Sequence, residues 1–241
     1  MAGASNRNAM QWLAALTLAA GYGVYGIWTW GLPWAAVTAA KLVPVKWEQH
    51  LGEAMMTSLA PGAKPCWGEV AQRLERAIDG GTPYKFEVRC AAGEEVNAFA
   101  APGGSIVVFE GIRSRMVRDE LAAAVVAHEM QHVLKRHSMQ AVFRGFALQA
   151  LFALLLGDAS SLAAQLAGGM TALHYQRGDE EEADRGAVEL MRRAGFDPRA
   201  VAEMLEALRE ATKEGGAPPE WLSSHPDLDG RIAETRRLAA R

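Results

Sequence analysis

Residues 119–136 read DELAAAVVAHEMQHVLKR, and this stretch decides which class of fold the sequence predicts. Asp119 is a residue type that caps helices, and the apolar and alanine positions after it are typical of a helix buried on most of its sides. His128 and His132 stand four residues apart on one helical face, so that both imidazoles can bind one zinc ion while Glu129 reaches a water bound to that ion. The stretch therefore predicts a buried helix that carries an H-E-x-x-H metal site.

A catalytic zinc ion needs a third protein ligand and an open coordination position. The acidic run EEEAD starts at Glu180, and Asp184 lies one turn later on the same face, so Glu180 can bind the ion while Asp184 hydrogen-bonds a ligand histidine. The alternative is a solvated first turn whose carboxylates complement the helix dipole. His137, five residues after His132, points away from the metal if the helix continues and is expected at the surface or in a cap, whereas His174 is expected to be structural.

Four blocks of sequence together resemble peptidase family M48, whose zinc metallopeptidases carry an H-E-x-x-H helix followed by an E-x-x-x-D helix. The blocks occur in family order and lie within residues 96–104, 128–138, 177–185 and 224–232. The resemblance covers residues 47–240. It implies an α+β, mainly α-helical fold of the zincin-like (gluzincin) type with a small β-sheet.

The resemblance also implies one zinc ion per chain with three protein ligands, His128, His132 and Glu180. It makes Glu129 the general base that takes a proton from water and passes it to the leaving amine. Asp184 becomes the partner of a ligand histidine. The expected reaction is the hydrolysis of peptide bonds.

Two further positions bear on the resemblance. His225 matches the late His-Pro motif of the family and is expected near the metal, where it either stabilises the oxyanion or occludes the site; the alternative is a histidine in a turn. Gln131 departs from the family pattern, in which small residues are common at this position, and is expected to affect packing but no ligand. No residue that the chemistry requires is missing.

Alternating and apolar segments predict the rest of the domain. Three short strands are expected, over residues 84–90, 96–100 and 105–109. The last of them is expected to be an edge strand on which an extended substrate adds as another strand, with internal pairing as the alternative. Helices are expected over residues 47–59, 67–78, 145–157, 159–176, 179–194, 198–213 and 228–239. The two between residues 145 and 176 are expected in the core, with contact with a bilayer as the alternative.

The N-terminal segment differs from the rest of the chain in charge. Arg7 is the only charged side chain among the first 40 residues, and residues 10–31 are apolar over a length that suits a transmembrane helix. A cleaved signal peptide has a shorter apolar region, and a buried core helix is rarely this long. We therefore predict a membrane anchor over residues 1–43 and a metallopeptidase domain over residues 44–241. Basic residues on the two sides nearly balance and leave the orientation open.

Composition limits the partners. The 241 residues include 25 basic and 28 acidic side chains, for a net charge of -3, without the basic stripe that a nucleic-acid-binding protein carries. Cys66 and Cys90 are the only cysteines, and they can form a disulfide in an oxidising compartment, with free buried thiols as the alternative.

Similarity to anchored, single-span members of the family in Gram-negative bacteria implies an inner-membrane protein with its catalytic domain in the periplasm. We expect a zinc endopeptidase that degrades misfolded or misassembled envelope proteins, with unfolded proteins and the lipid bilayer as its partners. The alternatives are a protease that processes one dedicated substrate, a cytoplasm-facing enzyme, and a latent, chaperone-like assembly factor whose zinc site His225 closes. The oligomeric state is left open.

Overall fold

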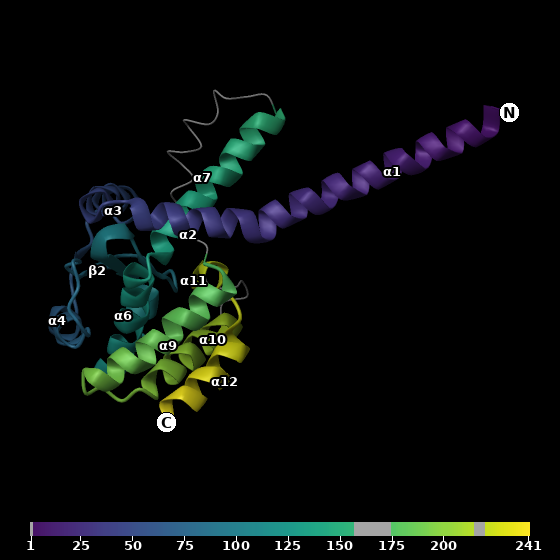
Figure 1. The fold of residues 1–241 in the computed structure, drawn as a ribbon. Coiled ribbons are helices and arrows are strands. Elements are labelled where there is room, and N and C mark those ends of the chain that lie inside the picture. Colours follow the sequence, from purple (N-terminus) through teal and green to yellow (C-terminus); the bar gives the residue numbers. More distant parts are fainter. Residues whose placement is uncertain (1, 157–174, 215–219) are drawn as a thin grey trace.

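The computed structural model describes residues 2–156, 175–214 and 220–241. Helices pack around one small sheet, and the N-terminal helix extends away from this body (Figure 1). The predicted fold, mainly α-helical with a small sheet, is confirmed. Most of the helix expected over residues 159–176, together with His174, lies outside the described residues.

Most helices of the body follow predicted segments with shifted ends. The helices are α3 (Val45–Leu59), α4 (Gly68–Arg76), α5 (Glu110–Arg113), α6 (Asp119–Leu134), α7 (His137–Leu156), α9 (Arg177–Arg193), α10 (Ala200–Glu214), α11 (Glu220–Ser224) and α12 (Leu228–Ala239). Helix α7 begins eight residues earlier than expected, and α5 and α11 were not predicted. Helix α6 is buried along almost its whole length and packs against α4, α9 and α10. It begins one residue after its N-cap, Arg118, so the predicted cap at Asp119 is wrong. Asp119 lies in the first turn, where its charge complements the helix dipole.

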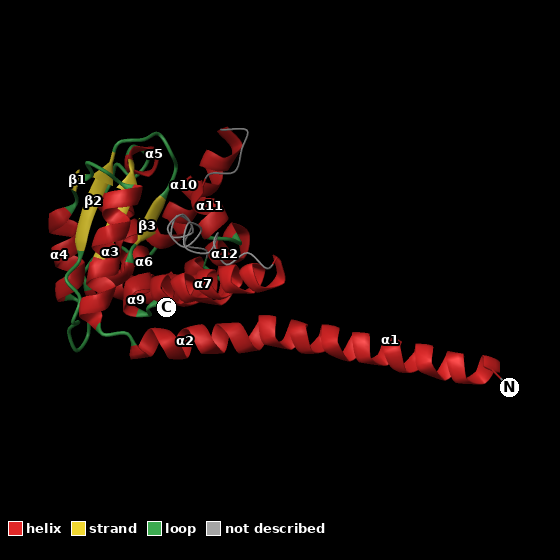
Figure 2. Cartoon of the chain, turned by 90° about the horizontal axis from the view of Figure 1, so that it is seen from above, coloured by secondary structure: helices red, strands yellow, loops and turns green. Residues whose placement is uncertain are grey.

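The sheet corrects the prediction of an edge strand over residues 105–109. Its strands are β1 (Lys64–Pro65), β2 (Glu87–Ala91), β3 (Ala98–Ala100) and β4 (Ser105–Phe109), in the order β1-β2-β4-β3. Strand β4 lies between β2, to which it is parallel, and β3, to which it is antiparallel (Figure 2). Ile106, Val107 and Val108 are fully buried, as the side chains of a strand covered on both faces must be. The outer strand of the described sheet on this side is β3.

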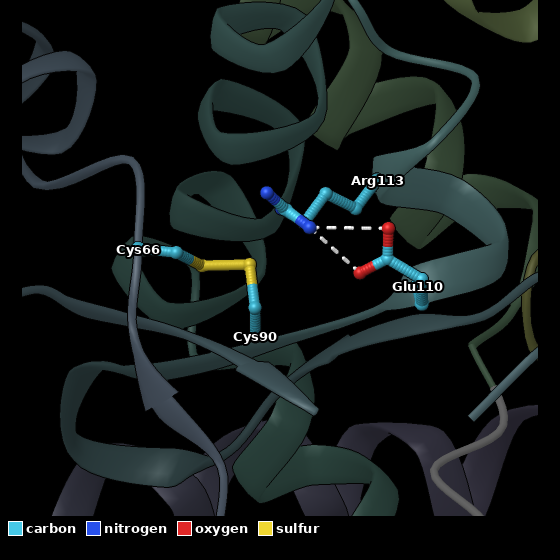
Figure 3. The surroundings of a disulfide bond; sticks show 4 residues. All are labelled: Cys66, Cys90, Glu110 and Arg113. Carbon is cyan, nitrogen blue, oxygen red and sulfur yellow. Dashed lines mark hydrogen bonds and ion pairs between the residues drawn. A yellow bond between two sulfur atoms is a disulfide. The ribbon is translucent and has the colours of Figure 1, made fainter. Parts of the chain in front are cut away.

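A disulfide connects the start of the body to the sheet. Cys66, between β1 and α4, is bonded to Cys90 in β2, with an S–S distance of 2.03 Å and a Cα–Cα distance of 5.7 Å (Figure 3). This pairing confirms the predicted disulfide. The ion pair between Glu110 and Arg113 of α5, 2.8 Å long, is drawn beside it. The bond attaches the segment before α4 to a strand that is 24 residues later in the chain.

Helices α6 and α9 pack closely at one point. The side chain of Gln131 in α6 is buried against Gly186 of α9. A Cβ atom at Gly186 would lie 2.3 Å from Oε1 of Gln131, which is closer than real Cβ atoms approach any neighbour. The missing side chain at Gly186 therefore leaves room for Gln131, a residue larger than the small ones expected at this position.

The N-terminal segment is helical from Ala2 to Leu42. Helix α1 (Ala2–Gly26) continues through a π-helical turn (Ile27–Gly31) into α2 (Leu32–Leu42), and α2 packs beside α7 (Figure 1). Apolar side chains of α1 are exposed to solvent, with 72% of Trp12 accessible. Among the described residues, no helix combines the length and the apolar character needed to cross a membrane. The transmembrane prediction for residues 10–31 is therefore not supported, because glycine, tyrosine and glutamine interrupt the aliphatic residues of α1.

The turn between α6 and α7 is joined to the end of α2. Arg136 adopts a left-handed conformation (φ 59°) in this turn. Its guanidinium donates hydrogen bonds to the carbonyls of Ala40 and Val43, the second at 3.0 Å, and lies 3.2 Å from the buried carboxylate of Glu48 in α3. It also donates to the hydroxyl of Tyr84 at 3.1 Å. One side chain thus connects α2, α3 and the end of α6.

Candidate metal centre

The last turns of α6 present two histidines to one point. His128 and His132 are four residues apart on the helix, which places both imidazoles on one face. Their Nε2 atoms are 3.1 Å apart, and both side chains are buried. The structure therefore brings the two predicted histidine ligands together.

Helix α9 supplies the third predicted group. Gln176 and Asp179 form a capping box at its start, which leaves Glu180 in the first turn facing α6. The carboxylate of Glu180 lies 3.3 Å from Nε2 of His132 and 3.5 Å from Nε2 of His128. Glu180 is fully buried, so the solvated first turn that was the alternative does not apply to this residue.

Asp184 lies one turn after Glu180 and contacts the other nitrogen of a histidine. Its Oδ1 atom is 3.0 Å from Nδ1 of His128. Arg231 of α12 donates two hydrogen bonds to the Asp184 carboxylate, at 2.7 and 2.9 Å, and lies 2.6 Å from Glu180. All of these side chains are buried. Arg231 lies in the last of the four blocks that resemble the family, within residues 224–232. The sequence did not predict its contacts with both carboxylates.

His225 also enters the cluster. Its Nδ1 atom lies 2.9 Å from Glu180 and 3.4 Å from Nε2 of His128. The ring of Trp221 stacks on it at 4.3 Å between centroids and 14° between planes. Trp221 in turn donates its backbone N–H to the carbonyl of Val96, next to β3. His225 lies in the segment between α11 and α12, and its side chain is completely buried beside His128 and Glu180, as the resemblance led us to expect.

The donor atoms fit a zinc ion. Ligands bound at about 2.0–2.1 Å in a tetrahedron lie roughly 3.3 Å apart. The two Nε2 atoms are 3.1 Å apart, and the Glu180 carboxylate approaches them with Oε1 at 3.3 Å from His132 and Oε2 at 3.5 Å from His128. Together with His225 they form a group in which all ligand atoms lie within 4.8 Å of one another. Two imidazoles and a carboxylate are also the chemical donor set that zinc uses in hydrolytic enzymes.

The protein environment sets the protonation of the donors. Burial lowers the pKa of His128, but its hydrogen bonds to Asp184 and Glu180 outweigh burial and raise the pKa to about 9. Burial dominates at His132 and holds its pKa well below the ordinary value. Burial raises the pKa of Glu180, but the electrostatic influence of His225 and of a nearby guanidinium is stronger and keeps that pKa well below its usual range. A metal ion that enters the site therefore finds Glu180 ionised and His132 neutral. To bind His128 as well, it has to displace a proton from that imidazole.

Glu129 is placed beside the cluster. It follows His128 directly in the chain, and its Oε1 atom lies 3.8 Å from Nε2 of His225. Both of its carboxylate oxygens are buried and accept no hydrogen bond from a described residue. Burial raises the pKa of this carboxyl above its ordinary value, which makes it a stronger base than an exposed glutamate.

The prediction that His137 lies at the surface or in a cap is wrong. The side chain is 2% exposed, and its Nδ1 atom lies 3.2 Å from Nδ1 of His132. The prediction assumed that the helix continues, but α6 ends at Leu134 and the left-handed Arg136 turns the chain back towards the site. Tyr175 also escaped prediction; its ring stacks on that of His132, with 3.8 Å between centroids.

Comparison with a family model supplies the deciding observation. The model of peptidase family M48 matches residues 68–239, a range that includes every residue of the cluster. The chain belongs to peptidase family M48. An M48 peptidase with this buried His/Glu cluster is a zinc metalloendopeptidase, as the sequence predicted.

Curated relatives of this M48 peptidase include proteases from bacteria and mitochondria. The chain is 35% identical over 173 residues to the β-barrel assembly-enhancing protease of Escherichia coli (strain K12). The matched region covers 66% of this chain and 35% of that protein. It is 31% identical over 180 residues to the mitochondrial metalloendopeptidase OMA1 of Schizosaccharomyces pombe. Here the matched region covers 72% of this chain and 53% of that protein. The M48 peptidase described here thus spans about a third to a half of the length of these relatives.

Proposed function

We propose that this M48 metalloendopeptidase hydrolyses peptide bonds in misfolded or misassembled proteins of the bacterial envelope. The observation that carries the proposal is the buried cluster of His128, His132 and Glu180 with Glu129 beside it. Similarity to β-barrel assembly-enhancing proteases supports a substrate class of proteins that are still being assembled.

We assign the binding of zinc to His128, His132 and Glu180, and the orientation of His128 to Asp184. Zinc, when bound, polarises the scissile carbonyl and activates a water molecule as the nucleophile. Glu129 accepts the proton of that water and delivers it to the leaving amine nitrogen. The buried carboxylate is suited to both steps because burial raises its pKa and so favours its holding the proton between them.

The substrate backbone pairs with β3 in this proposal, since β4 is an internal strand. The N–H of Phe109 bonds to the carbonyl of Asn97, so the backbone groups of Ala98, one residue further along, face away from β4. Along this edge, Trp221 donates to the carbonyl of Val96 and Ser138 to that of Ala100. An extended segment therefore adds there as another strand once these groups move aside, through contacts that do not depend on its side chains. Such recognition favours unfolded or flexible substrates over folded ones.

We further propose that the N-terminal helix attaches the enzyme to the inner membrane and that the catalytic domain faces the periplasm. The exposed apolar side chains of α1, among them Leu13, Leu16 and Leu18 at 65–66% exposure, support attachment to lipid. The disulfide supports an oxidising compartment.

Cleavage of an unfolded protein by the wild type and by Glu129→Gln tests the proposal, with bound zinc measured in both. We expect the variant to keep its zinc and to lose activity by about 10²–10⁴-fold, since it can no longer accept a proton. Glu120→Gln, in the first turn of the same helix, is the matched control and should retain wild-type activity. Equal cleavage by the wild type and Glu129→Gln would contradict the assigned base.

A second candidate function is that of a latent, chaperone-like factor. In this case the enzyme is inactive and binds unfolded proteins without cleaving them. His225 favours it, because its Nδ1 atom lies among the ligand atoms at 2.9 and 3.4 Å, where a fourth ligand would lie. The backbone hydrogen bond from Trp221 to Val96 also places α11 against the outer side of β3. Absence of cleavage by a fully zinc-loaded wild type would favour this candidate.

A further inference from the structure

His137 contacts His132, a residue of the cluster, but it is neither one of the assigned zinc ligands nor the assigned base. Its Nδ1 atom lies 3.2 Å from Nδ1 of His132, and its Nε2 atom lies 3.3 Å from Oε2 of Glu182. Its side chain is 2% exposed, whereas that of Glu182 is 47% exposed and pairs with Lys135 at 3.1 Å. A chain of contacts therefore leads from His132 to the surface of the molecule.

The geometry determines which nitrogen of each ring carries a proton. Nε2 of His132 is the atom that faces His128 and Glu180, at 3.1 and 3.3 Å, so it is the nitrogen available to a metal. A neutral histidine that binds metal through Nε2 carries its proton on Nδ1 and donates it to a neighbour. That neighbour is Nδ1 of His137, which must therefore be unprotonated. The proton of His137 is then on Nε2 and is donated to Glu182.

We propose that His137 is a positioning residue, which accepts the Nδ1–H of His132 and is itself held by Glu182, so that Nε2 of His132 is fixed as the zinc-binding atom. The proposal rests on the assignment of His132 as a zinc ligand. His137 is not a ligand itself, because its nearer nitrogen faces the side of His132 that is turned away from the cluster.

The two ligand histidines thus have supports of different kinds. His128 is held by the buried carboxylate of Asp184 at 3.0 Å, whereas His132 is held by a neutral imidazole backed by a carboxylate at the surface. Tyr175 stacks on the ring of His132 and restrains its plane, but ring stacking does not select one nitrogen over the other. The hydrogen bond to His137 supplies that selection.

Zinc affinity of the full-length protein, measured by competition with a chromophoric chelator, tests the proposal. We expect His137→Ala to weaken zinc binding by about 10–100-fold, as is typical for loss of a group that orients a metal-binding histidine. Glu182→Ala should weaken it by a smaller factor, because His137 remains as the acceptor. Two controls, His50→Ala and Glu181→Ala, change exposed residues of the same types and should leave the affinity within about twofold of the wild type. Wild-type zinc affinity in a folded His137→Ala protein would overturn the proposal.

A second measurement uses the wild type and does not depend on a variant that folds. Long-range ¹H–¹⁵N correlation spectra of the zinc-loaded protein identify which nitrogen of each histidine is protonated. We expect the proton on Nδ1 of His132 and on Nε2 of His137; a neutral His137 protonated on Nδ1 would overturn the proposal. The outcome is separate from that of the proposed function, since loss of activity in Glu129→Gln can coexist with unchanged zinc affinity in His137→Ala.

Discussion

At the scale of single residues, one buried guanidinium holds two carboxylates of the site. Arg231 contacts both Glu180 and Asp184, at 2.6 and 2.7 Å, so that α12 fixes the two acidic groups of α9. A buried pair of carboxylates is unfavourable without a nearby positive charge. Arg231 supplies that charge at Oε2 of Glu180, the same oxygen that lies 3.5 Å from Nε2 of His128. Little in the sequence indicated this contact, because Arg231 is 47 residues from Asp184 in the chain.

Replacement of His225 by alanine tests whether this residue closes the site. We expect His225→Ala to retain one zinc ion per chain and to cleave unfolded protein at least about tenfold faster, because a closed state favoured by ~1.4 kcal/mol leaves only about a tenth of the molecules open. Zinc content and initial cleavage rates are the measurements, and His50→Ala, which changes an exposed histidine, is the control. Loss of stoichiometric zinc would instead make His225 a necessary ligand.

The raised pKa of His128 predicts how zinc affinity depends on pH. Without metal, this imidazole is protonated below pH about 9, and zinc must displace the proton. The apparent affinity should therefore rise by about tenfold per pH unit between pH 7 and 9 and level off above that. His132 and Glu180 do not titrate in this window, because their pKa values lie well below the ordinary ones.

Zinc-buffered titrations between pH 6 and 10 measure this dependence, with the chelator's own protonation corrected at each pH. Stability of the metal-free protein should follow the opposite trend. Because the folded pKa of His128 lies above its unfolded value of 6.5, its contribution is complete below pH 6.5 and is lost as the pH rises through about 9. A zinc affinity that stays constant between pH 7 and 9 would show that His128 is already neutral.

At the scale of elements, the distance between α6 and α9 sets the distance between the zinc ligands that they carry. The close approach at Gln131 and Gly186 lies between His128 and His132 on one helix and just after Asp184 on the other. Helix packing at this point therefore bears directly on the geometry of the cluster.

A methyl group at Gly186 should separate the two helices. We expect Gly186→Ala to lower the free energy of unfolding by about 1–3 kcal/mol, as overpacking of a buried contact does, and to weaken zinc binding. Gly178→Ala, in the first turn of the same helix with no atom within 4 Å of the new Cβ, is the matched control and should change stability by less than about 0.5 kcal/mol. Combining Gly186→Ala with Gln131→Ala should restore zinc binding, as urea unfolding and chelator competition would show.

The two helices that carry the ligands could be predicted from sequence because their signals are local. Spacing along a helix fixes which side chains share a face, so it paired His128 with His132 and Glu180 with Asp184, and the resemblance to the family implied that the two pairs meet. The internal position of β4 could not be predicted in this way, since its parallel pairing with β2 skips the intervening strand. The prediction for His137 was wrong for a related reason. The left-handed turn at Arg136 does not alter the hydrophobic periodicity from which helix ends are predicted.

At the scale of the whole molecule, a disulfide-bonded body continues into an apolar N-terminal helix that extends away from it (Figure 1). The body encloses the site from elements that are distant in sequence: α6 and α9 supply the cluster, α12 holds its carboxylates and α11 covers it. A bond that stabilises this body should therefore also protect the activity of the site.

Removal of the disulfide measures how far the body depends on it. We expect the Cys66→Ser and Cys90→Ser double variant to lose about 3 kcal/mol of unfolding free energy, because the bond restricts a loop of 24 residues in the unfolded chain. Urea unfolding with and without reductant is the measurement. Reductant should destabilise the wild type to a similar extent and leave the double variant unchanged, and equal stability of all samples would contradict the prediction.

The contact of Arg136 with the end of α2 has a mechanical consequence. The same short turn that ends the zinc-binding helix holds the carbonyls of Ala40 and Val43 and the carboxylate of Glu48. A tilt of the N-terminal helix would therefore act on the end of α6, about one turn from His132 and about two turns from His128. If the N-terminal helix is attached as proposed, the way in which it is held bears through Arg136 on the alignment of the metal ligands.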